Sequence, residues 1–315
     1  MSRVLITGAT GFIGDGLAKM LFAQGTEVCC AGRRANTSLP SPISQTLIRD
    51  IANINDWAPA FEDVDVVVHL AGIAHRHRAT NAEDRAFHRV NAMGTGALAT
   101  AAGRAGVRRV VLASSIAVNG NTTPDLPFRE NSEVRPEGAY ALSKLCAENT
   151  LRQVAVEYGF EWCIIRPPMV YGRDAPGNFA RLTNLVMSGR PMPFGRAVAK
   201  KSLISIGNLL SAIRQLITHP SAANQLFLVS DDEDVSVLNF IQHIGRALGR
   251  KPLLLNVPEG VIRYAGGLLG RGSDVAKLFN PLIIDASHIQ TTLQWTPPLS
   301  VIEGVEDAFR HLQKS

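Results

Sequence analysis

The sequence predicts an α/β protein in which a doubly wound parallel sheet carries a smaller C-terminal lobe. Short apolar runs rich in β-branched residues alternate with longer helical patterns through the first half of the chain. These runs are almost continuously hydrophobic, as expected for parallel strands that are buried on both faces. After Arg166-Pro167-Pro168 the sequence pattern changes, because proline, glycine and asparagine become frequent. The predicted strands and helices also alternate less regularly there. The sheet is therefore expected first and the lobe second.

The alternation also defines the expected elements. We expect strands at residues 4–6, 27–31, 64–70, 110–113 and 162–165, and helices at residues 12–24, 83–105 and 140–158. The first domain is predicted to span residues 1–167 and the second residues 168–315, with room for the second to return a strand or a helix to the first.

The composition is that of an ordinary globular protein and excludes several classes of function. The 315 residues are 46% hydrophobic and 19% charged, and the formal net charge of +5 argues weakly for a small anionic ligand and against a nucleic-acid partner. No stretch is long enough to insert into a membrane and the first strand begins too early for a signal peptide, so we expect a cytoplasmic protein. The cysteines lack metal-ligand spacing and are interpreted as reduced core residues; they are Cys29, Cys30, Cys146 and Cys163.

Three glycines follow the first strand and open the first helix, in the run Thr-Gly-Ala-Thr-Gly-Phe-Ile-Gly. Glycines permit a tight turn and a close approach of the backbone, and the helix N-terminus offers free N–H groups to a pyrophosphate. Because strand, glycines and helix come in the required order, we predict a dinucleotide site here. The residues expected to contact it are Gly8, Thr10, Gly11, Phe12, Ile13 and Gly14.

The end of the second strand indicates which dinucleotide is bound. An acidic residue usually binds the ribose hydroxyls here, but this strand ends in Gly32-Arg33-Arg34. Arginines hold a 2′-phosphate through charge-assisted hydrogen bonds, so NADP(H) is the expected cofactor and NAD(H) the alternative. The simpler interpretation is that both arginines are solvated loop residues. Further cofactor contacts are expected from Asp50 and Ile51 beside the adenine and from Leu70, Ala71 and Gly72 near the phosphates.

Tyr140 and Lys144 are the candidate acid–base pair. They lie four residues apart, so in a helix both project from one face. A lysine ammonium one turn away favours the phenolate and would lower the tyrosine pKa from its ordinary value of about 10. Such a pair exchanges a proton near neutral pH, as reactions at a carbonyl or carbinol carbon require. The same spacing also arises by chance on surface helices, so the prediction of a catalytic pair depends on the other motifs of the chain.

With these motifs in order, the chain resembles the extended short-chain dehydrogenase/reductase (NAD-dependent epimerase/dehydratase) family over nearly its whole length. The residues that carry the resemblance are the glycine run, His69-Leu70-Ala71-Gly72, Val90-Asn91, Ser114-Ser115, Tyr140-x-x-x-Lys144 and Arg166-Pro167. The resemblance implies that Ser115, or alternatively Ser114, polarises the substrate oxygen. It implies further that Tyr140 donates or accepts the proton and that Lys144 binds the nicotinamide ribose and tunes the tyrosine.

The same resemblance implies supporting roles. Asn91 would support the site, while Ser114 and Pro167 would lie beside the cofactor. Relatives commonly dimerise through two helices, and the helices expected at residues 83–105 and 140–158 would form the interface of a homodimer. The family usually has Val-Tyr-Gly after the serine, whereas this chain has Val118-Asn119-Gly120. This difference is not expected to affect the catalytic residues.

The C-terminal half resembles the bacterial UDP-4-keto-6-deoxy-N-acetylhexosamine reductases and UDP-hexosamine 4-epimerases of surface-polysaccharide synthesis. The resemblance rests on Gly177-Asn178-Phe179, Lys200-Lys201-Ser202 and the run from Leu293 to Pro298. It implies a UDP-sugar substrate whose diphosphate is bound by Asn178 and Lys201. His75, in the basic run His75 to Arg78, is either a pocket residue or part of a solvated loop. No metal site is expected, because no third ligand accompanies the histidines.

The direction of the reaction follows from the cofactor. A reductase exchanges its cofactor at each turnover and draws on the NADPH pool, so Arg33 and Arg34 favour NADPH-dependent reduction of a C4 ketone. The alternative is 4-epimerisation with tightly bound NAD. Two other interpretations stay open, a reductase for a ketone without a nucleotide and a relative that binds NADP(H) without catalysis.

Overall fold

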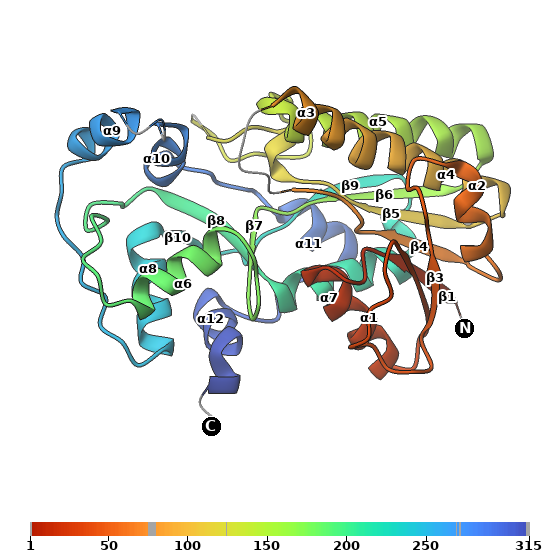
Figure 1. Cartoon of the computed structure of the whole chain (residues 1–315), viewed down its shortest axis with the longest axis horizontal. Coiled ribbons are helices and arrows are strands. Elements are labelled where there is room, and N and C mark those ends of the chain that lie inside the picture. The colour runs from red at the N-terminus through yellow and green to blue at the C-terminus, as the bar shows by residue number, and fades with distance from the viewer. Residues whose placement is uncertain (1, 75–79, 124, 269, 271, 313–315) are drawn as a thin grey trace.

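A seven-stranded parallel sheet forms the centre of the molecule and carries helices on both faces (Figure 1). The computed structural model describes residues 2–74, 80–123, 125–268, 270 and 272–312. The strand order is β3-β2-β1-β4-β5-β6-β9, so the doubly wound parallel sheet predicted from the sequence is confirmed. Its strands are β1 (Arg3–Thr7), β2 (Glu27–Gly32), β3 (Ser44–Leu47), β4 (Val66–His69), β5 (Arg109–Ala113), β6 (Glu161–Arg166) and β9 (Gln225–Leu228).

Alternating side chains of the strands separate two cores. Val4 and Ile6 point to the face covered by α1, α7 and α11, whereas Leu5 points to the face covered by α2, α4 and α5. The helices of the chain are α1 (Phe12–Ala23), α2 (Ile54–Trp57), α3 (Asn81–Phe87), α4 (Gly94–Arg104), α5 (Gly138–Tyr158), α6 (Asn178–Met187), α7 (Ile206–Thr218), α8 (Val237–Ala247), α9 (Glu259–Leu268), α10 (Gly272–Phe279), α11 (Ser287–Leu293) and α12 (Val301–Phe309). None of the helices in the described ranges combines the length and the apolar character needed to cross a membrane.

The smaller lobe is built on a three-stranded sheet of order β10-β8-β7, on the left of Figure 1. Its strands are β7 (Met169–Tyr171), β8 (Lys200–Ser205) and β10 (Asp234–Ser236). A third core of aromatic and aliphatic side chains from α6, α8 and α12 packs against this sheet, around the buried rings of Tyr171, Phe179 and Phe240.

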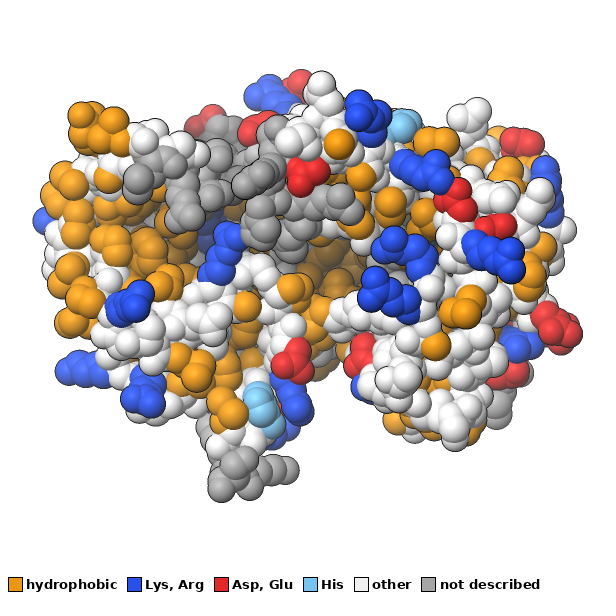
Figure 2. All heavy atoms as spheres, viewed as in Figure 1, with side chains coloured by type: hydrophobic (Ala, Val, Ile, Leu, Met, Phe, Trp, Pro, Cys, Tyr) orange, Lys and Arg blue, Asp and Glu red, His pale blue; other side chains and the backbone are white. Residues whose placement is uncertain are grey.

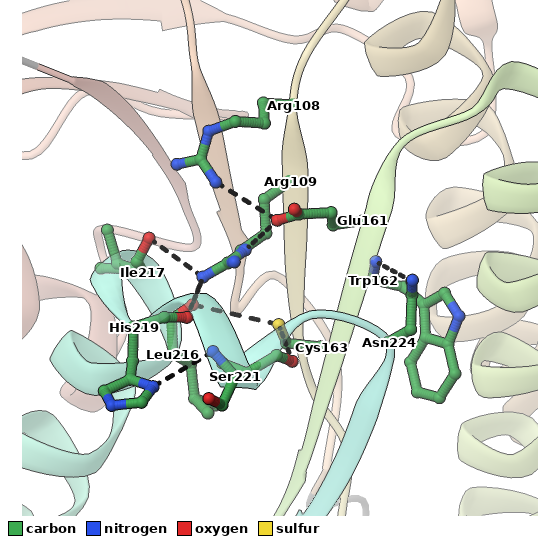
Figure 3. A network of polar contacts seen from close by, with 11 residues as sticks. Arg108, Arg109, Glu161, Trp162, Cys163, Leu216, Ile217, His219, Ser221 and Asn224 are labelled. Carbon is green, nitrogen blue, oxygen red and sulfur yellow. Dashed lines mark hydrogen bonds and ion pairs between the residues drawn. The ribbon is translucent and has the colours of Figure 1, made fainter. Parts of the chain in front are cut away.

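Arg109 ties the returning half of the chain to the large sheet (Figure 3). Its guanidinium is buried and donates to Glu161 at 2.6 Å and to the carbonyl oxygens of Leu216 and His219 at 2.8 and 3.0 Å. The last carbonyls of a helix lack partners within the helix, so Arg109 satisfies the C-terminal end of α7. Both α7 and β9 come from beyond residue 167, and the domain division at that residue stays a prediction.

Two local expectations were wrong, and one strand was left without predicted bounds. The segment 83–105 is not one helix, because a π-helical turn at His88–Met93 separates α3 from α4. No bounds were predicted for strand β3, since its sequence Ser-Gln-Thr-Leu is polar and it lies at the sheet edge, where no second neighbour buries it. Cys146 is exposed on α5, whereas Cys29, Cys30 and Cys163 are buried as predicted, and all four thiols are free.

Candidate active site

The glycine loop lies where its backbone approaches the end of β4 most closely. A Cβ atom at Gly8 would come within 2.8 Å of Ala71 N and of Leu70 C, and the φ angle of Gly8 is +73°. A Cβ atom at Gly14 would come within 2.3 Å of Gly8 O. The loop is closed by Gly11 N–H, which donates to Gly8 O at 2.9 Å. Only glycine fits at Gly8 and Gly14, and no side chain caps the N-terminus of α1, so its free N–H groups can be offered to a pyrophosphate.

Thr7 and His69 hold the segment after β4 in place, and sequence reasoning gave neither a role. The hydroxyl of Thr7 accepts hydrogen bonds from the N–H groups of Leu70 and Ala71 at 3.2 and 3.1 Å. The same hydroxyl lies 2.8 Å from Nδ1 of His69. Because its oxygen already accepts two hydrogen bonds, we assign the hydroxyl as the donor and Nδ1 as the acceptor. Burial is the main reason that the pKa of His69 falls to about 3, so the ring is neutral. Thr7 directly precedes Gly8 of the glycine loop, and this position in the sequence could have identified it as a residue of the site.

The predicted adenosine side of the site opens at the carboxyl end of β2. Arg33 and Arg34 are both exposed, and Arg34 lines a narrow crevice together with Thr10 and Asn36. Neither arginine forms an ion pair with a described residue, so both guanidinium groups are available to an anion. Asp50 accepts from Arg89 at 2.5 Å, so its carboxylate is already bonded within the protein.

The structure brings Ser115 and Tyr140 together at the carboxyl end of β5. Ser115 begins a short 3-10 turn and Tyr140 lies in the first turn of α5. A hydrogen bond joins the two side chains, and the ring of Tyr140 packs edge-on against Phe87 with the centroids 5.8 Å apart. A phenol and a hydroxyl placed in this way can hold one substrate oxygen between them.

Lys144 lies one turn further along α5 and is buried. Its ammonium donates to the carbonyl of Ala113 at 2.8 Å, and it lies 3.4 Å from the position that a Cβ atom would take at Gly72. Asn91, in the π-helical turn, donates to the hydroxyl of Ser143 at 3.0 Å and accepts from Ile73 N–H at 3.0 Å. Helix α5 and the turn are thereby fixed around the place expected for a nicotinamide ribose.

The ionisation of the pair differs in one respect from the expectation. Burial raises the pKa of Tyr140 by more than the hydrogen bond from Ser115 lowers it, so the predicted lowering by Lys144 is not found. Burial also lowers the pKa of Lys144 to about 8, and the carboxylate of Glu148 acts in the opposite direction. Lys144 therefore titrates close to physiological pH, while Tyr140 keeps its proton.

Glu148 is a third residue of the site, after Thr7 and His69, that was not predicted from the sequence. It is fully buried, accepts from the Ser114 hydroxyl at 2.5 Å, and forms a two-point ion pair with Arg166 at 2.8 and 2.6 Å. The Ser114 hydroxyl is thus used inside the protein, whereas Ser115 faces Tyr140. Pro167 accepts through its carbonyl from Ile116 N–H at 3.0 Å and holds the turn after Ser115. The signal for Glu148 was its position four residues after Lys144 on the same helix face.

A cavity of about 490 Å³ opens in the smaller lobe. It is lined by Asn178 and Lys201, the predicted substrate residues, and by Asn121 from the loop after Ser115. Burial lowers the pKa of Lys201 to about 8, and its ammonium donates to the carbonyl of Asn280. Most of the remaining wall is apolar, and half of its residues are apolar side chains of α6, α8, α9 and α10. His75 lies outside the described residues, and within these no group of three or more potential ligands is placed to bind a metal ion.

Comparison with known proteins agrees with this geometry. Residues 4–229 match the model of the NAD dependent epimerase/dehydratase family. The chain is 38% identical over 307 residues to a UDP-glucose 4-epimerase of Vibrio cholerae, covering 96% of this chain and 92% of that protein. It is also 27% identical, over 85% of the chain and 77% of the relative, to an N-acetyl-α-D-glucosaminyl-diphospho-ditrans,octacis-undecaprenol 4-epimerase of Escherichia coli O157:H7. A Thermus thermophilus UDP-glucose 4-epimerase in complex with NAD has the same fold, with a TM-score of 0.81 at 22% identity over 99% of both chains. The chain belongs to the NAD-dependent epimerase/dehydratase family.

Proposed function

We propose that this protein is a UDP-sugar 4-epimerase that interconverts UDP-linked hexoses or N-acetylhexosamines with NAD(H). The observation that carries the proposal is the 38% identity to the Vibrio cholerae UDP-glucose 4-epimerase along nearly the whole chain. It is supported by a site in which Ser115, Tyr140 and Lys144 lie around one position at the end of β5. The alternative considered from the sequence thereby replaces the reductase as the favoured function.

The residues of the chain fit the cofactor. A Cβ atom at Gly8 would clash with the backbone of Leu70 and Ala71, and one at Gly14 with the backbone of Gly8, so these glycines permit the tight loop whose N–H groups can bind a pyrophosphate. A Cβ atom at Gly72 would crowd Asn91 and Lys144, so glycine keeps the surroundings of the Lys144 ammonium open for a ribose. When bound, NAD would supply the hydride acceptor for C4 of the sugar and the hydride donor for the ketone.

The chain's own residues handle the proton. The phenolate form of Tyr140 takes the proton of the 4-hydroxyl while C4 is oxidised, and Ser115 donates a hydrogen bond to the oxygen of the resulting ketone. Because burial keeps Tyr140 protonated in the free protein, this step requires the charged ammonium of Lys144 to favour the phenolate once the substrate is bound. Once the 4-keto sugar has turned in the pocket and its opposite face is reduced, Tyr140 gives the proton back to the C4 oxygen. The sugar regains the hydride and the proton that it lost, so the product is the C4 epimer and no net oxidation takes place.

The sugar nucleotide is assigned to the cavity of the smaller lobe. Asn178 and Lys201 offer an amide and an ammonium to a diphosphate, and the apolar wall offers a surface for a uracil ring. To bind phosphate, the ammonium of Lys201 exchanges its hydrogen bond to Asn280 for one to the ligand.

The test is to incubate the purified protein with UDP-glucose or UDP-N-acetylglucosamine and to separate the epimers by chromatography. We expect UDP-galactose or UDP-N-acetylgalactosamine to appear without added cofactor. Denatured protein should release NAD in close to stoichiometric amount. Failure to form either epimer, with NAD bound to the protein, would refute the proposal.

A second candidate is NADPH-dependent reduction of a UDP-4-keto-6-deoxy-N-acetylhexosamine. It is favoured by one observation, the two exposed arginines at the end of β2 where an acidic residue would select NAD. Oxidation of NADPH in the presence of the 4-keto sugar, without epimerase activity, would establish it. Replacing Arg33 and Arg34 with alanine should then weaken NADP(H) binding far more than NAD(H) binding. An equal effect on the two cofactors would mean that both arginines are solvated loop residues that do not recognise the 2′-phosphate.

A further inference from the structure

The smaller lobe has an unusual concentration of exposed apolar side chains. We define the lobe surface as the exposed part of residues 175–200 and 235–268, which form α6, α8, α9 and the chain between them. Half of the sixteen large hydrophobic side chains that are exposed in the described structure belong to these two segments. They are Leu185, Met187, Val198, Leu253, Leu255, Val261, Tyr264 and Leu268. On the left of Figure 2, orange side chains gather on this lobe, with scattered blue side chains and white surface among them.

Helix α9 presents the clearest apolar stripe. Val261, Tyr264 and Leu268 recur at intervals of three and four residues and are 56%, 72% and 73% exposed. On its inner side the same helix is anchored by Ile262, which lines the cavity. A helix that is apolar on both sides leaves one of them without cover in the monomer, and exposed patches of this kind mark interaction sites.

Charge on the lobe surface is strongly biased. Residues 175–200 and 235–268 contain eight Lys or Arg and a single acidic residue, Glu259, whereas the rest of the chain contains 24 basic and 26 acidic residues. Glu259 is paired with Arg263 at 2.6 Å. These two segments therefore carry a net charge of +7, and the rest of the chain, with the acidic run at residues 231–234 directly before the second segment, carries −2.

The basic and apolar groups lie next to each other in space. Met192 N–H donates to Leu253 O and Leu255 N–H donates to Met192 O, both at 2.8 Å, so the segment after α6 runs beside the segment before α9. This pairing brings the chain around Arg190 and Arg196 alongside the exposed Leu253 and Leu255. Apolar side chains bordered by cations are the composition of a surface that binds at the interface of an anionic bilayer.

We propose that the lobe surface docks onto a membrane of anionic phospholipids, with the stripe of α9 in the interface and the basic residues on the lipid phosphates. The association is peripheral, since no described helix can span a bilayer. A second copy of the chain is the poorer occupant, because two surfaces of this positive charge would repel each other.

The test uses the full-length protein and co-sedimentation with vesicles. Binding is expected to vesicles of equimolar phosphatidylcholine and phosphatidylglycerol but not to phosphatidylcholine alone, and added salt should weaken it. The double variants Tyr264→Glu with Leu268→Glu and Arg250→Glu with Lys251→Glu should each lower the vesicle partition coefficient about tenfold. The matched control Leu47→Glu removes an equally apolar, 62% exposed side chain on β3 and should bind as the unmodified protein does.

Three results would overturn the proposal. One is the absence of binding to anionic vesicles, and another is binding that neither double variant weakens. The third is a lower mass of the Tyr264→Glu and Leu268→Glu variant in light scattering without vesicles, which would assign the lobe surface to a second copy of the chain. Vesicle binding does not depend on the substrate, so these outcomes are separate from those of the epimerase assay.

Discussion

The hydroxyl of Tyr140 is the single group on which proton transfer depends. Replacing Tyr140 with phenylalanine keeps the ring and its edge-on contact with Phe87 but removes the proton donor. We expect turnover to fall by about 10²–10⁴-fold, the usual contribution of a positioned acid–base group. Bound cofactor and the thermal midpoint should stay the same, as measured by absorbance after denaturation and by circular dichroism. If the variant turned over substrate about as fast as the unmodified protein, Tyr140 would not be the proton-transfer residue.

Lys144 should set the alkaline limit of activity. Burial lowers its pKa to about 8, so its ammonium is present below that pH and is lost as the pH rises through it. If the charge is needed to stabilise the phenolate, the rate falls on the alkaline side near pH 8. The carboxylate of Glu148 raises the pKa of Lys144, and its removal should move this limit to lower pH.

The variant Glu148→Gln tests that coupling through the pH dependence of kcat. Because Arg166 then loses its buried partner, we also expect the free energy of unfolding to fall by about 3–5 kcal/mol. The profile is therefore measured well below the unfolding midpoint of the variant. Glu157→Gln, on an exposed position of the same helix, is the matched control and should leave the profile in place. An unshifted alkaline limit in Glu148→Gln would show that Glu148 has only a structural role.

Among the elements, β5 and α7 depend on one buried side chain. Replacing Arg109 with alanine leaves the carbonyl oxygens of Leu216 and His219 without their donor and removes the charge that faces Glu161. We expect the free energy of unfolding to fall by about 2–4 kcal/mol, measured by guanidinium denaturation.

Arg108 provides a matched control for that experiment. It contacts the same Glu161 at 3.2 Å, but its side chain is 48% exposed. Exposed pairs contribute little, so Arg108→Ala should cost less than about 1 kcal/mol. Equal losses in the two variants would mean that the ion pair with Glu161, and not the bonds to the end of α7, stabilises the junction.

The elements also show how far the sequence determines the fold. Strands β1, β2, β4, β5 and β6 were predicted because burial on both faces makes them continuously apolar. The glycine loop was predicted because close backbone approach excludes every other residue type, as Gly8 and Gly14 show. The polar edge strand β3 and the π-helical turn around Asn91 leave no such pattern, since both are set by tertiary neighbours.

The candidate site shows the same division. Tyr140 and Lys144 share a helix, so their relation could be predicted from spacing. The partnership of Glu148 with Ser114 and Arg166 joins three elements, and no local pattern encodes it. Nor could the direction of the Tyr140 pKa be predicted, because it follows from burial that only the folded chain creates.

At the scale of the whole molecule, the two halves of the sequence do not form two separate cores. One face of the large sheet is covered partly by α7 and α11, and β9 completes the sheet beside β6. Residues as distant in sequence as Val4, Ile213 and Trp295 belong to one buried cluster. Folding of the sheet therefore requires chain from beyond the predicted boundary.

A fragment of residues 1–167 tests this dependence. It lacks the strand that pairs with β6 and the helix whose end binds Arg109, and it exposes the apolar face on which α7 and α11 pack. We expect the fragment to show no cooperative thermal transition and to be digested rapidly by trypsin. A second fragment extended to residue 229 restores β9 and α7, and should be more resistant than the first because it regains the seventh strand and most of that core. If the shorter fragment unfolded cooperatively with a midpoint near that of the full chain, residues 1–167 would be an independent domain and the returning elements would be dispensable to it.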